Sequence, residues 1–178
     1  KSYLSDLRDL RVEVNRGYKL PVWVDENTLV IVCSYSGNTE ETISCYKDAI
    51  RKKSKVLGIA TGGKIKDMFN KNNHPLLILP KGMQPRNAIC YLFFTSLKVL
   101  ENSQLIPKQT TFIKDTIKAL KKPMLDKAAQ DLAKSLVNKI PLIYASSNLS
   151  VVAYRWKCEF NENAKIHAFS ATLPELNH

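Results

Sequence analysis

The stretch that decides the fold is Thr28-Leu-Val-Ile-Val-Cys-Ser-Tyr-Ser-Gly-Asn-Thr39. Its first half, residues 28–33, is a continuous and largely β-branched apolar run, which is typical of a strand buried on both faces. A polar turn follows at residues 34–38, and from Thr39 to Lys53 the apolar residues recur at helical spacing. Acidic residues open this predicted helix and basic residues close it, as a helix dipole favours. The stretch therefore predicts a strand, a turn and a helix in direct succession.

The same alternation continues along the next fifty residues. Strands are expected at residues 55–60 and 76–79, with a short helix at 64–71 between them and a longer helix at 86–100. Strands that alternate with helices at this spacing form a parallel sheet through right-handed crossovers. We therefore expect an α/β protein with a doubly wound parallel sheet.

A second succession of strand, serine-rich turn and helix begins late in the chain. Its strand is expected at residues 140–144 and its helix at 150–163, after a lysine-rich helical stretch at 101–139. We expect two related lobes, the first at residues 1–122 and the beginning of the second at 123–178. The chain opens without methionine and ends soon after the second lobe begins, so we expect a fragment of a larger two-lobe protein.

Composition excludes several classes of protein. The 178 residues are 44% hydrophobic and 24% charged, which is ordinary for a globular protein. No apolar run approaches the ~18 residues that a membrane span needs, so no membrane association is expected. Collagenous, disordered and disulfide-scaffold proteins are excluded as well.

The chain is strongly basic. Lysine and arginine outnumber acidic residues by 27 to 16, which gives a net charge of +11. Such a surface attracts nucleic acids, but it also attracts small phosphorylated metabolites. The basic residues lie in helix-like stretches without arginine–aromatic interleaving, zinc-finger spacing or an RNP-like signature. We therefore expect solvated helix faces and no nucleic-acid partner.

The four cysteines show neither a CxxC pair nor metal-ligand spacing. Cys33 and Cys90 lie in apolar runs, so we expect both to be small buried hydrophobic residues. Reduced thiols favour a reducing compartment, and we expect a cytoplasmic protein without a metal site.

The turn at residues 34–39 is the sharpest candidate for a binding site. It follows a buried strand and opens a helix, where open α/β sheets bind their ligands and free backbone N–H groups suit a phosphate. The turn carries three hydroxyl side chains: Ser34, Ser36 and Thr39. An ordinary helix cap made by Asn38 or Thr39 is the alternative interpretation. Three hydroxyls and Gly37 within six residues exceed what a cap needs, so we predict a phosphate-binding loop.

Residues 34–42, Ser-Tyr-Ser-Gly-Asn-Thr-Glu-Glu-Thr, resemble the phosphosugar-binding signature of SIS (sugar isomerase) domains. Other segments resemble the bifunctional phosphoglucose/phosphomannose isomerases of archaea and some bacteria: Gly17-Tyr-Lys-Leu-Pro21 leading into Val24-Asp-Glu-Asn-Thr-Leu29, Gln84-Pro-Arg86, and Asn161-Glu-Asn163 with Pro174-Glu-Leu-Asn-His178. The resemblance covers essentially the whole chain. That family has two flavodoxin-like SIS lobes and is substantially longer. Its Gly-Gly-Ser phosphate loop would precede Lys1, and the rest of its second lobe would follow His178.

The resemblance implies an aldose–ketose isomerase without a cofactor. It would interconvert glucose 6-phosphate, and mannose 6-phosphate, with fructose 6-phosphate through a cis-enediol. By resemblance, Arg86 stabilises the enediolate, Glu162 moves a proton between C1 and C2, and His178 opens the sugar ring. The family histidine can come from the neighbouring subunit, so a homodimer is implied. Taken alone, a loop arginine, a helix-end glutamate and a single histidine would be ordinary surface residues.

Two alternatives remain open from the residues. One is a non-catalytic SIS regulator that binds a sugar phosphate, although such a protein has no reason to keep Glu162 and His178. The other is the isomerase lobe of an amidotransferase that forms an amino sugar. We expect the 178-residue chain alone to be inactive as an isomerase, because the Gly-Gly-Ser loop and much of the second lobe would lie outside it.

Overall fold

The structure is a computed structural model that describes residues 2–5 and 10–177. Contacts divide the chain into two units: the first ends at Ile106, and the second comprises a short N-terminal piece and the chain from Pro107 onward. The helix α1 (Ser2–Ser5) belongs to the second unit, where the Tyr3 hydroxyl donates to the Gln109 side chain. The predicted lobes at 1–122 and 123–178 stay a prediction. No helix in the described ranges has the length and apolar character needed to cross a bilayer.

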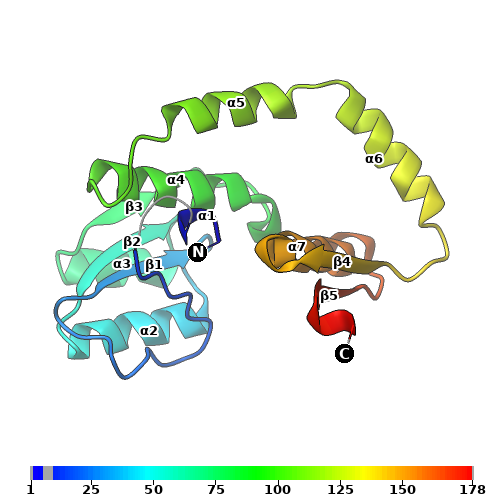
Figure 1. The fold of residues 1–178 in the computed structure, drawn as a ribbon. Helices are drawn as coiled ribbons and strands as arrows, with labels where there is room; N and C mark the ends of the chain where they lie inside the picture. Colours follow the sequence, from blue (N-terminus) through cyan, green and yellow to red (C-terminus); the bar gives the residue numbers. More distant parts are fainter. Residues whose placement is uncertain (1, 6–9, 178) are drawn as a thin grey trace. The chain divides into compact units, whose positions relative to one another are not determined.

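The first unit is a parallel three-stranded sheet with helices on both faces (Figure 1). Its elements follow in the order β1 (Leu29–Ser34), α2 (Glu40–Arg51), β2 (Lys55–Ala60), α3 (Gly63–Lys71), β3 (Leu76–Ile78), η1 (Pro85–Asn87) and α4 (Ile89–Asn102). The strands pair in the order β1-β2-β3, and Ser34, Ala60 and Ile78 end them side by side. The expectation of an α/β fold with a doubly wound parallel sheet is confirmed. The loops that follow the three strands therefore lie at one edge of the sheet.

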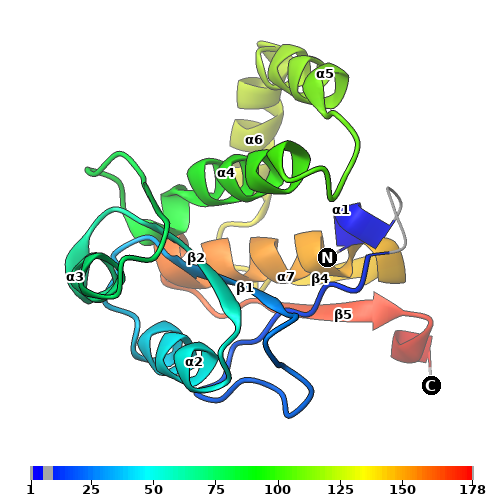
Figure 2. The same ribbon diagram turned by 90° about the vertical axis from the view of Figure 1, so that its left-hand side faces the viewer.

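Two buried clusters hold the helices to this sheet. Side chains of α2 and α3 pack against one face, in a cluster made of Val32, Tyr46, Ala49, Val56, Ala60, Ile65 and Phe69. On the other face, Tyr35, Ile59, Leu79 and Ala88 form a smaller cluster next to α4. Figure 2 shows α2 and α4 on opposite sides of β1 and β2. The strand residues alternate between the two clusters because successive side chains of a strand point to opposite faces.

The second unit contains a smaller parallel pairing. It comprises α5 (Thr110–Leu120), α6 (Met124–Ser135), β4 (Leu142–Ser146), η2 (Ser147–Leu149), α7 (Ser150–Glu159), η3 (Phe160–Ala164), β5 (Phe169–Leu173) and η4 (Glu175–Asn177). Strands β4 and β5 pair in parallel, and α7 packs against both. Sequence patterning predicted β4 and α7 but missed β5, because its mixed sequence Phe-Ser-Ala-Thr-Leu lacks a continuous apolar run.

Two expectations about burial are wrong. Leu29 is 39% exposed and Cys33 is exposed, so β1 is not buried throughout. The reason is its place at the edge of the described sheet, where only β2 pairs with it. Cys90 is exposed as well, because it lies in the first turn of α4, whose buried residues Leu97 and Leu100 come later in the helix.

The core cluster on the α2 side predicts that replacing Phe69 lowers the free energy of unfolding far more than replacing Phe93. Phe69 is fully buried and stacks on Tyr46 with a centroid distance of 4.2 Å, whereas Phe93 is 40% exposed. We expect Phe69→Ala to lower the free energy of unfolding by about 3–5 kcal/mol, because it leaves a cavity in a packed core. Urea denaturation monitored by circular dichroism measures the loss. Phe93→Ala is the matched control, and an equal loss in both variants would contradict the described core.

Candidate functional site

The hydroxyl loop, residues 34–39, connects β1 to α2 and folds back on itself. The Ser34 side chain is buried; its hydroxyl lies 2.8 Å from the Thr39 hydroxyl and accepts a hydrogen bond from the Gly37 N–H at 3.0 Å. The Ser36 hydroxyl accepts from the Asn38 N–H at 3.2 Å. Six residues of chain thus bring two of the three predicted phosphate ligands, Ser34 and Thr39, into contact.

The first turn of α2 has no side-chain cap among the described residues. Thr39 is the N-cap in an extended conformation, and its hydroxyl meets Ser34 rather than the helix. The Asn38 side-chain oxygen (Oδ1) accepts from the Lys64 N–H at 3.0 Å, at the start of α3. The interpretation of Asn38 or Thr39 as an ordinary cap of α2 is therefore wrong. The first N–H groups of α2 remain available to an anion at the helix's positive end.

Backbone contacts fix the hydroxyl loop against the loop between β2 and α3. The Thr61 N–H donates to the Tyr35 carbonyl and the Ile65 N–H donates to the Gly37 carbonyl, both at 2.9 Å. Gly37 has φ +72°, and a Cβ built on it would lie 1.8 Å from the Gly62 carbonyl oxygen. Only glycine allows this approach, so position 37 is fixed by geometry.

Arg86 leaves the sheet at the same edge as the hydroxyl loop. It lies in η1, which follows β3, and its side chain is half-buried. Tyr35 of the hydroxyl loop donates to the Pro80 carbonyl at 2.8 Å and accepts from the Met83 N–H at 3.2 Å. The structure therefore connects the predicted phosphate loop with the stretch that leads to Arg86.

Glu162 lies in the second unit, in the π-helical turn η3 that extends α7. The residue is exposed. Its flanking asparagines bond to the surrounding chain: the Asn161 side-chain oxygen accepts from the Ala168 N–H at 3.0 Å, and Asn163 donates to Glu159 at 2.5 Å. These bonds shape the turn that carries Glu162, and single π turns in helices are frequent at functional sites. His178, the predicted ring-opening residue, lies outside the described residues.

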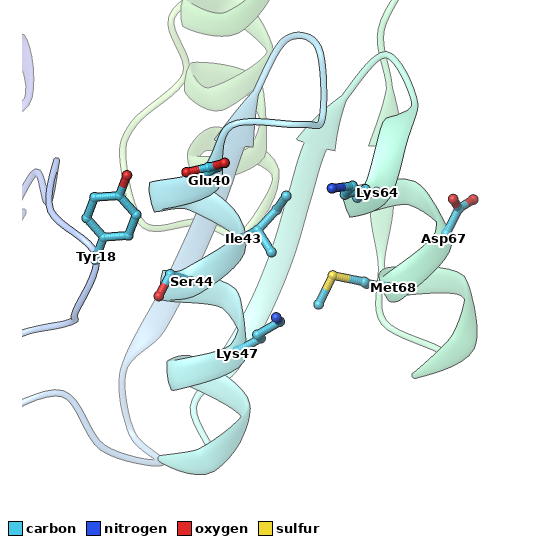
Figure 3. Close-up of a pocket in the computed structure, with 8 residues that line it drawn as sticks. All are labelled: Tyr18, Glu40, Ile43, Ser44, Lys47, Lys64, Asp67 and Met68. Carbon is cyan, nitrogen blue, oxygen red and sulfur yellow. The ribbon is translucent and has the colours of Figure 1, made fainter.

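A groove of about 530 Å³ runs between α2 and α3, beside the hydroxyl loop (Figure 3). Its lining residues are Tyr18, Glu40, Ile43, Ser44, Lys47, Lys64, Asp67 and Met68. The pKa of Tyr18 is raised above its ordinary value. The main cause is the negative charge of Glu41, followed by burial and by the negative charge of Glu40. Sequence reasoning missed this groove, because its walls come from helix faces that only the crossovers bring together. Within the described residues, no group of three or more histidine, cysteine or acidic side chains could hold a metal.

The chain is similar to proteins that are named as enzymes of sugar phosphates. Residues 125–178 match the family described as bacterial phospho-glucose isomerase C-terminal SIS domain. The bifunctional phosphoglucose/phosphomannose isomerase of Caldicellulosiruptor bescii is 40% identical over 99% of this chain and 55% of its own length. The D-glucosamine-6-phosphate 4-epimerase of Sulfolobus acidocaldarius is 38% identical over 97% of this chain and 56% of its own. The chain thus spans about half the length of the curated relatives it matches.

The solved structures agree on the fold. The tagatose-6-phosphate ketose/aldose isomerase of Escherichia coli superposes with a TM-score of 0.63, covering 88% of this chain and 46% of that one, at 18% identity. At that identity the likeness concerns the arrangement of helices and parallel strands. The likeness covers most of the chain.

The contact between Gly37 and Gly62 predicts the effect of a single methyl group. We expect Gly37→Ala to weaken the binding of inorganic phosphate at least about tenfold, because the added Cβ forces the hydroxyl loop away from the Gly62 carbonyl. Isothermal titration calorimetry measures the affinity. Gly17→Ala is the control, since a Cβ there meets only the Asn15 side chain at 3.8 Å. Equal phosphate affinity in the two variants would contradict this geometry.

Proposed function

Because the chain belongs to the bifunctional phosphoglucose/phosphomannose isomerase family, we propose that the protein is an aldose–ketose isomerase of sugar 6-phosphates. It interconverts glucose 6-phosphate, and mannose 6-phosphate, with fructose 6-phosphate. The observation that carries the proposal is the hydroxyl loop: converging hydroxyls at the uncapped start of a twelve-residue helix. Such a loop suits the phosphate that these sugars share.

Each proposed residue has one task in the reaction. Ser34, Ser36 and Thr39 bind the phosphate and fix the position of the sugar, which removes much of the entropy cost of aligning reacting groups. His178 moves the proton that opens the ring. Glu162 then removes the proton from C2 of the open-chain aldose and returns it to C1 through a cis-enediol. The Arg86 guanidinium stabilises the enediolate charge. The reaction transfers protons within the sugar, so its chemistry calls for no cofactor.

Partners and location belong to the same proposal. By resemblance, His178 serves a site shared between subunits, which implies a homodimer. The four cysteines are free, which supports a cytoplasmic location.

A second candidate function is 4-epimerisation of an amino sugar phosphate. It is favoured by the relative from Sulfolobus acidocaldarius, whose match covers 97% of this chain. Both functions need the phosphate loop, so the loop cannot distinguish them. The isomerase would move a proton between C1 and C2, whereas the epimerase would invert the configuration at C4.

The deciding experiment supplies the complete protein with each sugar separately. We expect fructose 6-phosphate from glucose 6-phosphate and from mannose 6-phosphate, measured by a coupled assay. Formation of the C4 epimer from glucosamine 6-phosphate, without fructose 6-phosphate from either hexose phosphate, would establish the epimerase instead. Tight binding of sugar phosphates without turnover would make the protein a regulator.

The role of Glu162 gives a separate prediction. We expect Glu162→Gln to lower kcat at least about 100-fold, because an amide cannot accept the C2 proton. Glu175→Gln is the matched control, since it changes another exposed glutamate of the same unit. The proposed base is refuted if both variants keep kcat within a few-fold of the unaltered enzyme.

The role of the hydroxyls predicts an effect on substrate binding. We expect Ser36→Ala to raise KM by about 10-fold or more with little change in kcat, because it removes a hydrogen bond to a charged phosphate. Steady-state kinetics with glucose 6-phosphate measures both constants, with Ser44→Ala in the adjoining groove as the control. A loss in kcat alone would argue against a phosphate ligand at Ser36.

A further inference from the structure

Tyr35 stands between two of the proposed phosphate ligands, Ser34 and Ser36, yet it faces elsewhere. It is only 7% exposed, and its ring packs with Ile59, Leu79 and Ala88. This cluster lies on the α4 side of the sheet, opposite the cluster of α2 and α3. Tyr35 thus belongs to the hydroxyl loop but packs on the α4 side of the sheet.

The Tyr35 hydroxyl is inserted into the turn at residues 80–83. In a four-residue turn, the first carbonyl commonly accepts from the N–H of the fourth residue. Here the hydroxyl binds both groups, donating to the Pro80 carbonyl at 2.8 Å and accepting from the Met83 N–H at 3.2 Å. Gly82 within it has φ +106°, a backbone conformation that favours glycine. The shape of the turn therefore depends on a hydroxyl from another loop.

This arrangement anchors the Arg86 segment, residues 79–88, at three points. Leu79 and Ala88 pack with the Tyr35 ring at its two ends, and the Tyr35 hydroxyl holds the turn between them. Arg86 lies in η1 between Met83 and Ala88. The turn also borders the loop between β2 and α3, because a Cβ on Gly62 would lie 3.5 Å from the Lys81 ammonium nitrogen.

We propose that Tyr35 is a positioning residue that couples the hydroxyl loop to Arg86. The proposal rests on the isomerase function proposed above. The neighbours of Tyr35 would hold the phosphate, and its hydroxyl holds the backbone that leads to Arg86, so the two groups keep one fixed spacing. Tyr35 touches no reacting atom; it sets the distance between the residues that do. Small displacements of such groups are costly in rate.

The first test separates positioning from binding. Tyr35→Phe keeps the ring and removes both hydrogen bonds to the turn. We expect kcat of the complete protein to fall about 10-fold or more, while KM and the affinity for inorganic phosphate stay within about 3-fold. In an Arg86→Ala background, Tyr35→Phe should cause no further loss in kcat, because both changes act on the same group. Losses that multiply, or an unchanged kcat in Tyr35→Phe, would overturn the proposal.

A buried tyrosine on the other face provides the matched control. The Tyr46 hydroxyl lies 2.8 Å from His74 Nδ1 and accepts from the Asn72 side chain at 3.0 Å. Tyr46→Phe also removes a buried hydroxyl, so it should lower stability without changing kcat. Equal losses of kcat in both variants would mean that any buried hydroxyl matters, and would overturn the specific role of Tyr35.

A second measurement does not depend on turnover. Amide hydrogen exchange in the complete protein should become about 10-fold faster at Met83 in Tyr35→Phe, and stay unchanged at Ile65, which donates to Gly37. Unchanged exchange at Met83 would overturn the proposal whatever the activity. Faster exchange in a protein that does not isomerise sugar phosphates would support the role of Tyr35 in holding the Arg86 segment and refute only the proposed function.

Discussion

The constraint on which the site depends is the backbone contact between Gly37 and Gly62. There is no room for a side-chain atom at position 37, since the Gly62 carbonyl occupies the place of a Cβ. Two parallel strands end side by side at Ser34 and Ala60, and the loops that follow them must pass within contact distance. Glycine lets them pass, and the N–H of Ile65 then bonds across the contact. The position of the hydroxyls follows from this contact between two main chains.

The six residues of the hydroxyl loop divide between two tasks. Three carry hydroxyls at the start of α2, and three serve the neighbouring loops. Tyr35 reaches the turn before Arg86, Gly37 admits the Gly62 carbonyl, and Asn38 caps α3. A loop that bound phosphate alone would need only the first set. The second set makes it the junction of three loops at one sheet edge, which is where ligands of open α/β sheets bind.

Sequence patterning predicted the elements of the first unit well, because each depends on local periodicity. Strand β2 and the start of α2 lie within a residue of expectation. Sequence patterning failed where contacts with residues distant in the sequence decide the structure. The partner of Asn38 lies 26 residues away, and the exposure of Cys33 depends on which strands flank β1. The proposed roles of Arg86 and Glu162 rest on family resemblance alone, because the periodicity of a sequence does not distinguish a catalytic side chain from a solvated one.

The contact between the two glycine loops also has a consequence for engineering. A designer who transplants residues 34–39 into another α/β scaffold cannot move them alone, because Gly37 and Asn38 are matched to the backbone at Gly62, Gly63 and Lys64. The smallest transferable module is both loops together with the parallel strands that bring them side by side.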